Sequence, residues 1–115
     1  MNAGTVHLSC PQGATYRRNI LWRIGSAPVN VNGYAARMQV RETYDSVDYL
    51  VSLTTENDGI VLGGASGTIS LYISDEDTSN FRVGVYVYDL ELVAPNGDVT
   101  RLIEGRFQVT PGATR

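Results

Sequence analysis

Alternation of apolar and polar residues is strongest in the C-terminal third of the chain, over residues 84–109. Two alternating runs, YVYDLELV and DVTRLIEGRFQV, flank the turn sequence APNG there. Asn-Gly between such runs is typical of a two-residue type I′ turn, because both central residues of that turn need a positive φ. With Asn96 and Gly97 as the loop, the sequence predicts one long β-hairpin in which Pro95 faces Asp98.

The register of this hairpin follows from its turn. One face is predicted to pair Leu92 with Arg101, Leu90 with Ile103, Tyr88 with Gly105 and Tyr86 with Phe107. The other face is predicted to pair Glu91 with Leu102, Asp89 with Glu104 and Val87 with Arg106. The first set is mostly apolar and the second more polar, and a slip of one residue would mix them. The pattern therefore specifies its own register.

Shorter runs of β-forming residues supply the other strands, which we expect at residues 5–10, 15–24, 34–42, 49–54, 60–62 and 68–73. In the second of these, Ile20, Trp22 and Ile24 share one face. In the last, Ile69, Leu71 and Ile73 point inward. Turns rich in Gly, Pro and Asn separate the runs.

Two segments carry helical signals. Residues 34–42 (YAARMQVRE) contain good helix formers, but apolar Ala36, Met38 and Val40 alternate with polar side chains, which favours a strand. Ser74 stands three residues before Asp77, a spacing that resembles a capping box, and acidic residues in a first turn suit the helix dipole. We expect one helical turn there.

Short strands, frequent turns and the absence of an amphipathic helix predict an all-β fold. We expect an antiparallel immunoglobulin-like β-sandwich of seven to eight strands. Residues 1–109 are predicted to form this single domain and residues 110–115 a C-terminal tail. Trp22 is the expected centre of the core, surrounded by Tyr86, Leu90, Ile103 and Phe107.

Composition narrows the classes of function. The net charge is −3 and no basic stripe is visible, so we expect no nucleic-acid partner. No apolar run reaches the ~18 residues of a membrane span, and the N-terminus lacks the pattern of a signal peptide. Cys10 is the only cysteine, which excludes an intrachain disulfide and favours synthesis in a reducing compartment. All nine basic residues are arginine, which fits either a GC-rich genome or protein–protein interfaces.

Candidate chemistry is sparse. His7 is the only histidine, so a Cys/His metal site or a His-based triad within one chain is excluded. Asp89 and Glu104 should face each other with Glu91 close by and Arg106 placed to bridge Asp89, but a sheet face is no enzyme pocket. We expect no enzyme and no catalytic residue.

Ligand sites are equally weak in the sequence. Asp75, Glu76, Asp77 and Asn80 carry oxygens suited to Ca²⁺, yet the EF-hand spacing is absent and helix capping explains the same residues. The glycines at 63–64 lack the Lys and Ser/Thr of a P-loop. We therefore predict no metal and no cofactor. The seven tyrosines would suit sugar stacking or a protein interface.

The order of a series of segments along residues 13–111 resembles that in a known group of proteins. The segments are GATYRR at 13–18, PVNVNGY at 28–34, MQVR at 38–41, GTISL at 67–71, SDEDT at 74–78, GVYVYDLEL at 84–92 and GRFQVTP at 105–111. The chain thereby resembles small proteins encoded in the tail modules of tailed bacteriophages and prophages. It is also similar to the N-terminal immunoglobulin-like domain of baseplate upper proteins, which attach receptor-binding proteins to the tail.

The resemblance implies a structural virion protein, made in the bacterial host cytoplasm, that acts in a tail, baseplate or tail-fibre attachment by protein–protein assembly. Its implied partners are other virion proteins, in a symmetric homo-oligomer, with no nucleic acid and no membrane. Alternatives are a capsid decoration or neck accessory protein and, in another class, a carbohydrate-binding module.

We expect the interface to contain arginines on two strands that are predicted to be neighbours, a glutamine on one of these strands, and residues of the C-terminal tail. These residues are Arg17, Arg23, Arg37, Gln39, Arg41, Thr110, Pro111 and Arg115.

Overall fold

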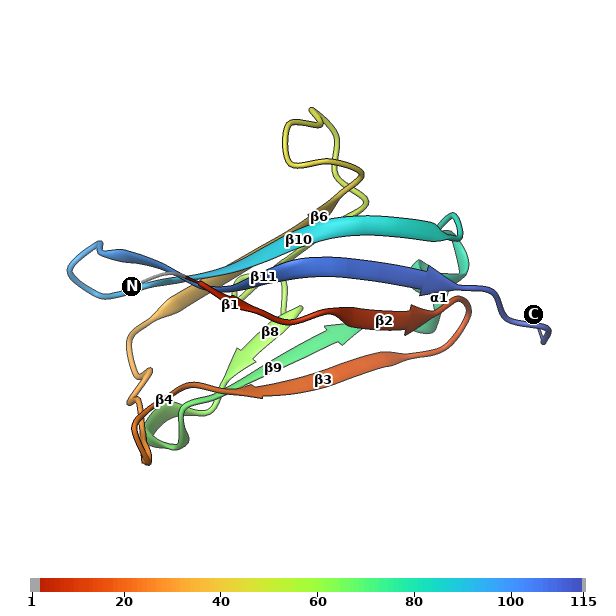
Figure 1. Ribbon diagram of the computed structural model, residues 1–115. Coiled ribbons are helices and arrows are strands. Elements are labelled where there is room, and N and C mark those ends of the chain that lie inside the picture. The colour runs from red at the N-terminus through yellow and green to blue at the C-terminus, as the bar shows by residue number, and fades with distance from the viewer. Residues whose placement is uncertain (1–2, 115) are drawn as a thin grey trace.

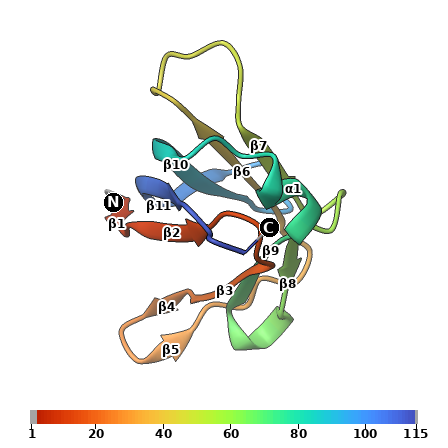
Figure 2. The same ribbon diagram turned by 90° about the vertical axis from the view of Figure 1, so that its right-hand side faces the viewer.

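Two β-sheets packed face to face make up the protein, and the computed structural model describes residues 3–114 of it (Figure 1). The larger sheet has the order β1–β11–β10–β6–β7, with β2 also paired to β11. The smaller sheet has the order β3–β9–β8, and β4 and β5 form a separate short hairpin. Figure 2 shows the two layers edge-on, with the β4–β5 hairpin below β3.

Eleven strands and two short helices are present in the described residues. The larger sheet contains β1 (Gly4–Thr5), β2 (Leu8–Pro11), β6 (Ala35–Arg41), β7 (Val51–Thr54), β10 (Gly84–Val93) and β11 (Val99–Thr110). The smaller sheet contains β3 (Tyr16–Leu21), β8 (Ile60–Leu62) and β9 (Thr68–Ile73), and the short hairpin is β4 (Arg23–Ile24) with β5 (Ala27–Pro28). The helices are η1 (Gly64–Ser66) and α1 (Asp75–Ser79).

The fold is an immunoglobulin-like β-sandwich, as the sequence predicted. Eight strands have three or more residues, because β1, β4 and β5 have only two each. A further hallmark lies between β9 and β10, where the Tyr86 hydroxyl donates to the carbonyl of Arg82 at 2.6 Å, which is the arrangement of a tyrosine corner. The pairing is antiparallel except at the N-terminal edge, where β1 and β2 run parallel to β11.

The predicted hairpin exists, but its register changes halfway. The pairs from Tyr86↔Phe107 to Leu90↔Ile103 are as predicted, whereas beyond a β-bulge Glu91 pairs with Arg101 and Leu92 with Thr100. The turn explains the change. Gly97 donates its N–H to the carbonyl of Ala94 and Ala94 donates to that of Asp98, both at 2.8 Å, so the loop has three residues.

Proline decides this turn type. The ring of Pro95 fixes φ at about −65°, which suits the second position of a type I turn. The residue with positive φ is then Gly97, at 93°. The predicted type I′ turn is therefore wrong. The three-residue loop sets the register of the strand pairs near the turn, whereas the apolar pattern sets a register that differs by one residue in the rest of the hairpin. The bulge at Leu90/Glu91 is the point where one register changes to the other.

Other predictions about local structure hold. Residues 35–41 form a strand rather than a helix, because Ala36, Met38 and Val40 all face the core. The Ser74 hydroxyl accepts a hydrogen bond from the N–H of Asp77 at 3.2 Å and begins α1. Ile69, Leu71 and Ile73 are fully buried, as expected for the inward face of β9.

Trp22 is not the centre of the core. It is half-buried at the end of β3 and packs edge-on against Tyr34, with ring centroids 6.0 Å apart. The predicted strand ends at Leu21, and Ile24 is 63% exposed in the β4–β5 hairpin. The centre is formed by Tyr88, Phe107, Met38 and Leu90, which are at most 1% exposed.

Two tyrosine hydroxyls in the core differ in their partners. Tyr88 donates to the carbonyl of Val6 at 2.5 Å, whereas the Tyr16 hydroxyl is buried with no partner among the described residues. Burial also raises the pKa of Tyr16 to about 12, with Arg18 acting in the opposite direction. Tyr16 therefore keeps a desolvated polar atom without a compensating bond.

We expect Tyr16→Phe to leave the free energy of unfolding unchanged or to raise it by up to about 1 kcal/mol, since it removes an uncompensated hydroxyl. Tyr88→Phe should lower it by about 1 kcal/mol, because the acceptor on Val6 loses its donor. Urea unfolding of the two variants measures the contrast. A larger loss for Tyr16→Phe than for Tyr88→Phe would show that the Tyr16 hydroxyl has a partner.

Candidate functional site

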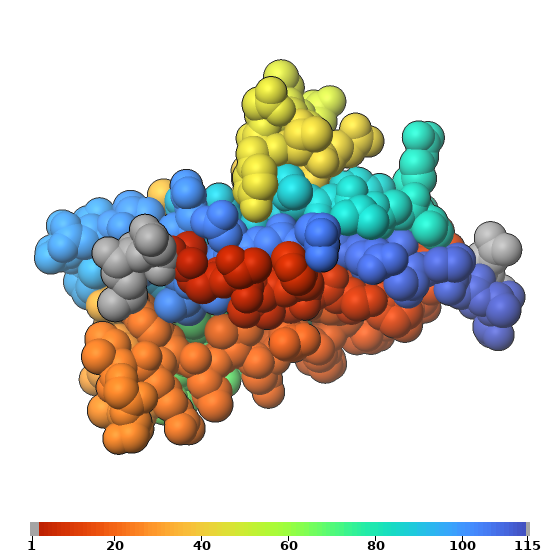
Figure 3. Space-filling view, viewed as in Figure 1, coloured from red at the N-terminus to blue at the C-terminus, as the bar shows by residue number. Residues whose placement is uncertain are grey.

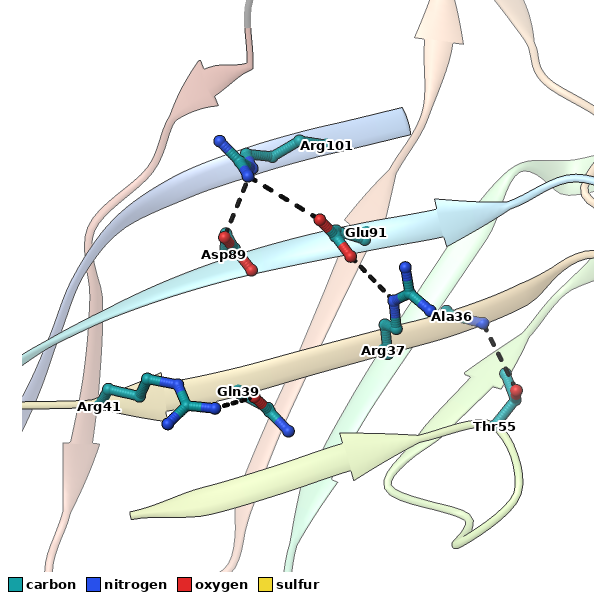
Figure 4. Close-up of polar contacts among 8 residues, drawn as sticks. All are labelled: Ala36, Arg37, Gln39, Arg41, Thr55, Asp89, Glu91 and Arg101. Carbon is teal, nitrogen blue, oxygen red and sulfur yellow. Dashed lines mark hydrogen bonds and ion pairs between the residues drawn. The ribbon is translucent and has the colours of Figure 1, made fainter. Parts of the chain in front are cut away.

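The outward face of the larger sheet carries a line of alternating charges across three strands (Figure 4). Arg37 on β6 meets Glu91 on β10 at 2.8 Å, between Nε and Oε1. Arg101 on β11 lies 3.4 Å from Asp89 Oδ2 and 3.9 Å from Glu91 Oε2. These side chains are partly exposed, so the ion pairs contribute little to the free energy of unfolding. Their main effect is to hold the charged side chains in one arrangement on the sheet face.

The bulge in β10–β11 builds this network. In the predicted register Arg101 would oppose Leu92 on the core face, but the observed register places it opposite Glu91 on the outer face. Asp89 does face Glu104, as predicted. The bridging cation is Arg101 rather than the predicted Arg106.

Asp89 is the most perturbed acid of this face. Burial raises its pKa, Arg101 lowers it, and Glu91 and Glu104 raise it again. A shallow depression of about 220 Å³ lies over it, with Gln39, Arg41 and Tyr44 among its walls. The phenol of Tyr44, the amide of Gln39 and the guanidinium of Arg41 line this depression together with the carboxylate, an arrangement suited to binding a polar group.

A loop of residues 42–50 joins β6 to β7 and stands away from the body of the molecule; we call it the 42–50 loop. Figure 3 shows it as the yellow projection above the larger sheet. Arg41 fixes the middle of the loop, because its Nη1 donates to the carbonyls of Ser46 at 2.9 Å and Val47 at 2.8 Å. Nη2 of the same guanidinium donates to Gln39 Oε1 at 2.5 Å.

The loop holds itself together as well. Thr43 donates its N–H to the Ser46 hydroxyl at 3.0 Å, and its own hydroxyl donates to Asp45 Oδ1 at 2.8 Å. The guanidinium of Arg41 lies 5.9 Å from the ring centre of Tyr49, within the range of a cation–π contact. The loop is therefore bound to the sheet by Arg41 at several points.

Apolar and aromatic side chains are nevertheless exposed on this loop. Val47 is 93% exposed, Tyr44 59% and Tyr49 54%. Tyr44 lines the depression over Asp89 and Glu91, so it lies on the side of the loop that overhangs the charged face. Partial burial, and then the negative charges of Glu104 and Asp89, raise the pKa of its phenol.

A cleft of about 450 Å³ opens on the other side of the loop, between it and the segment that follows α1. Its walls include Glu42, Asp48, Tyr49, Asn80 and Arg82. An aromatic ring beside acids, an amide and a guanidinium can bind a polar ligand, such as a sugar or a basic side chain.

The predicted interface residues do not form one surface. Arg37, Gln39 and Arg41 lie together on β6, as expected. Arg17 and Arg23 do not share their face, because β3 belongs to the smaller sheet and β4 to the separate hairpin. Consecutive strands of a sandwich commonly cross between sheets, so neighbours in sequence were wrongly taken as neighbours in one sheet.

The predicted tail begins later than residue 110. Thr110 is the last residue of β11 and its carbonyl accepts from the N–H of Gln12 at 2.8 Å. Pro111 is exposed just after the strand. Gly112 is so close to Gln12 that a Cβ there would lie 2.8 Å from the Gln12 carbonyl oxygen. Residues 110–112 are therefore held by the domain itself, and Arg115 lies outside the described residues.

The sequence reasoning missed the exposed side chains of the 42–50 loop. The signal was present for two of them: Tyr44 and Val47 stand in a segment without β alternation, flanked by acids. Tyr49 was placed in the strand predicted over residues 49–54, which begins only at Val51. Apolar residues that follow neither the strand nor the helix periodicity do not line up on a face that packs on the core. We could therefore have expected these side chains to be exposed at a binding surface.

Other groups considered in the sequence have structural partners. His7 Nδ1 accepts the N–H of Arg106 at 3.1 Å. Cys10 is fully buried, which raises the pKa of its thiol to about 11. Within residues 3–114, no group of three or more His, Cys, Asp or Glu side chains is placed to hold a metal ion. The same residues contain no helix of the length and apolarity needed for a membrane span.

Comparison with known proteins gives similarity in structure only. No protein-family model matches the sequence, and no curated protein matches it either. A voltage-gated sodium channel β subunit studied for multimeric cell-adhesive interactions is similar, with 13% identity, a TM-score of 0.47 and 92% of each chain covered. The extracellular domain of the sodium channel β4 subunit is similar with 12% identity and a TM-score of 0.44, over 97% of this chain and 96% of that one.

Proposed function

We propose that the protein is a structural component of a tailed-bacteriophage virion, in the tail, baseplate or fibre attachment, and that it acts by binding other virion proteins. The motifs at residues 84–92 and 105–111 support the phage context through their resemblance to tail-module proteins. The 42–50 loop supports the mode of action, and its exposed apolar tip is the observation on which the proposal depends.

A binding element of this kind needs apolar surface that is free before assembly. Val47 at the tip exposes nearly all of its side chain, and Tyr44 and Tyr49 flank it. Tyrosine is enriched at interfaces because its ring buries a large area while few torsions are immobilised. These three side chains can enter a pocket on a neighbouring protein.

The loop is also held in one conformation before it binds. Arg41 donates to the carbonyls of Ser46 and Val47 and contacts the ring of Tyr49. Pre-organisation lowers the conformational entropy lost on association. The assembly surface therefore consists of the loop together with the charged face below it, and Arg41 belongs to both.

The test is a double substitution in the 42–50 loop. We expect Val47→Asp combined with Tyr49→Ala to leave the melting temperature of the isolated protein within about 2 °C, because both side chains are exposed. The same variant should fail to enter assembled particles when it replaces the natural chain in a phage complementation assay. Quantitative mass spectrometry of purified virions measures its incorporation.

Val99→Asp is the matched control, since Val99 is 51% exposed at the first residue of β11, outside the loop. It should enter particles normally. Incorporation of the loop variant at the natural level would contradict the role of the loop, and absence of the natural chain from all virions would contradict the phage context. The two parts of the proposal can therefore fail separately.

A glycan-binding module is the second candidate, because the cleft beside the loop combines Tyr49 with Glu42, Asp48, Asn80 and Arg82. Aromatic rings stack on sugars while polar groups bind their hydroxyls. Binding of the isolated protein to a glycan array, abolished by Asn80→Ala, would favour this function over assembly.

A further inference from the structure

The two sheets differ in whether the outward backbone groups of their edge strands have hydrogen-bond partners. Edge strands present unpaired N–H and C=O groups, which another extended chain can pair with unless something covers them. β7 is one such edge and β3 is another. Their outward backbone groups can be compared one by one.

The edge of β7 is closed by a single side chain. Asn57 accepts the N–H of Thr54 at its Oδ1 and donates from Nδ2 to the carbonyl of Ser52, both at 2.9 Å. One amide thus occupies a donor and an acceptor that a further strand would need. A further strand cannot be added to this edge without displacing Asn57.

The edge of β3 is open. Trp22 donates its N–H to Gly67 in the direction of β9, so by the alternation of an antiparallel ladder Ile20 and Arg18 also point toward β9. The backbone groups of Arg17, Asn19 and Leu21 point the other way. None of them has a hydrogen-bond partner among the described residues, because both β1 and β2 pair with β11 instead.

Arginine surrounds this open edge. Arg17 and Arg18 are exposed on β3 and Arg23 is exposed on β4 directly after it. Arg17 stacks on the ring of Tyr72, 4.6 Å from its centre, on the outer face of the sheet. The three ion pairs formed within residues 3–114 all lie on the larger sheet, so these arginines have no carboxylate partner there.

We propose that the β3 edge binds an extended acidic segment of a partner protein as a fourth strand of the smaller sheet. Main-chain hydrogen bonds to Arg17, Asn19 and Leu21 would provide the register, and carboxylates along one face of the segment would pair with Arg17 on the outer face of the sheet. A second copy of β3 is a poor occupant, because it would bring two sets of these arginines together.

This surface is separate from the 42–50 loop, so variants of the loop leave it intact. It requires only that some partner be acidic and extended, whichever assembly contains it. The two proposals are therefore tested independently.

The experiment is a titration of the ¹⁵N-labelled protein with two capped heptapeptides, Thr-Glu-Val-Glu-Val-Glu-Thr and its Lys-for-Glu counterpart. We expect the acidic peptide to shift the amide signals of Arg17, Asn19 and Leu21 and to slow their hydrogen exchange. The amides of Arg18 and Ile20, already bonded to β9, should keep their exchange rates. The basic peptide should bind about tenfold more weakly or worse.

Variants at the edge give the controls. Asn19→Pro removes an outward N–H while leaving the backbone bonds to β9, so it should abolish binding. Asn19→Ala loses the same side-chain bond from the Ser70 hydroxyl but keeps the N–H, so it should bind normally. Arg17→Glu together with Arg18→Glu should reverse the preference toward the basic peptide, which holds even if the proline variant fails to fold. Asn57→Ala should open the β7 edge and add shifts at Ser52 and Thr54.

Three results would overturn the proposal. One is the absence of shifts at Arg17, Asn19 and Leu21 with millimolar acidic peptide. The second is equal binding of both peptides. The third is concentration-dependent broadening of the same amides without peptide, which would show that a second copy occupies the edge.

Discussion

Phe107→Ala is expected to lower the free energy of unfolding by about 3–5 kcal/mol. The ring is fully buried on β11 and packs edge-on against Tyr16 of the opposite sheet, with centroids 5.6 Å apart. Removing it empties the contact between the two layers at the centre of the sandwich. Since a domain of this size has a total stability of about 5–15 kcal/mol, the variant should be largely unfolded at 37 °C or close to it.

Trp22→Ala is the informative comparison. Both residues are large aromatics, but Trp22 is half-buried and contacts Tyr34 at the end of β3. We expect a loss of about 2 kcal/mol, roughly half the cost of a fully buried ring. Urea unfolding with circular dichroism measures both variants. Equal losses would restore Trp22 to the centre of the core, where the sequence pattern had placed it.

The misplacement of Trp22 shows a limit of periodicity. Ile20, Trp22 and Ile24 alternate correctly, yet the strand ends at Leu21, since the N–H of Trp22 bonds to Gly67 and its carbonyl to Val29. The alternation of apolar and polar residues does not predict that the strand ends there. What decides it is the close approach of Gly67, where a Cβ would lie 2.6 Å from the carbonyl oxygen of Trp22.

The hairpin shows how far pattern and turn chemistry reach together. The register counted from a two-residue loop, and supported by side-chain alternation, gave the correct partners from Tyr86 to Leu90, because the bulge restores that register. The partners nearer the turn were wrong because Asn-Gly was read without the preceding Pro95, which favours a type I turn. The error had a consequence for the surface, since the bulge is what carries Arg101 to the outer face.

The candidate site could be predicted only in part. Arg37, Gln39 and Arg41 follow from alternation on one strand, but the assignment of strands to sheets does not. Contacts between a strand and its following loop, such as those of the Arg41 guanidinium with the carbonyls of Ser46 and Val47, depend on loop geometry, which side-chain alternation does not encode. The capping of β7 by Asn57 is of the same kind.

Gly105→Ala is the second substitution expected to have a large effect. The backbone of Gly105 on β11 passes directly beneath the turn between β1 and β2. A Cβ there would lie 2.3 Å from the carbonyl oxygen of Val6 and 3.1 Å from His7 Nδ1. Because the first contact is with backbone rather than with a flexible side chain, the N-terminal segment must move away.

Moving that segment breaks a set of hydrogen bonds at once. Val6 donates its N–H to Glu104 at 2.9 Å, its carbonyl accepts from Tyr88, and His7 accepts from Arg106. At about 1 kcal/mol each, with the Tyr88 hydroxyl left buried, the loss should be about 3 kcal/mol or more. The amides of Val6 and Arg106 should also exchange with solvent faster than in the natural chain.

Gly84→Ala separates this steric effect from a general intolerance of alanine for glycine. Gly84 lies on the partner strand β10, and a Cβ there would meet nothing closer than the Tyr86 ring at 3.8 Å, an ordinary contact. Its free energy of unfolding should stay within about 0.5 kcal/mol of the natural value. If Gly105→Ala unfolds at the same urea concentration as Gly84→Ala, then β1 and β2 are not locked over β11. The N-terminal segment would then be free to leave β11 and cover the open edge of β3, so the same measurement bears on the edge proposed above as a binding site.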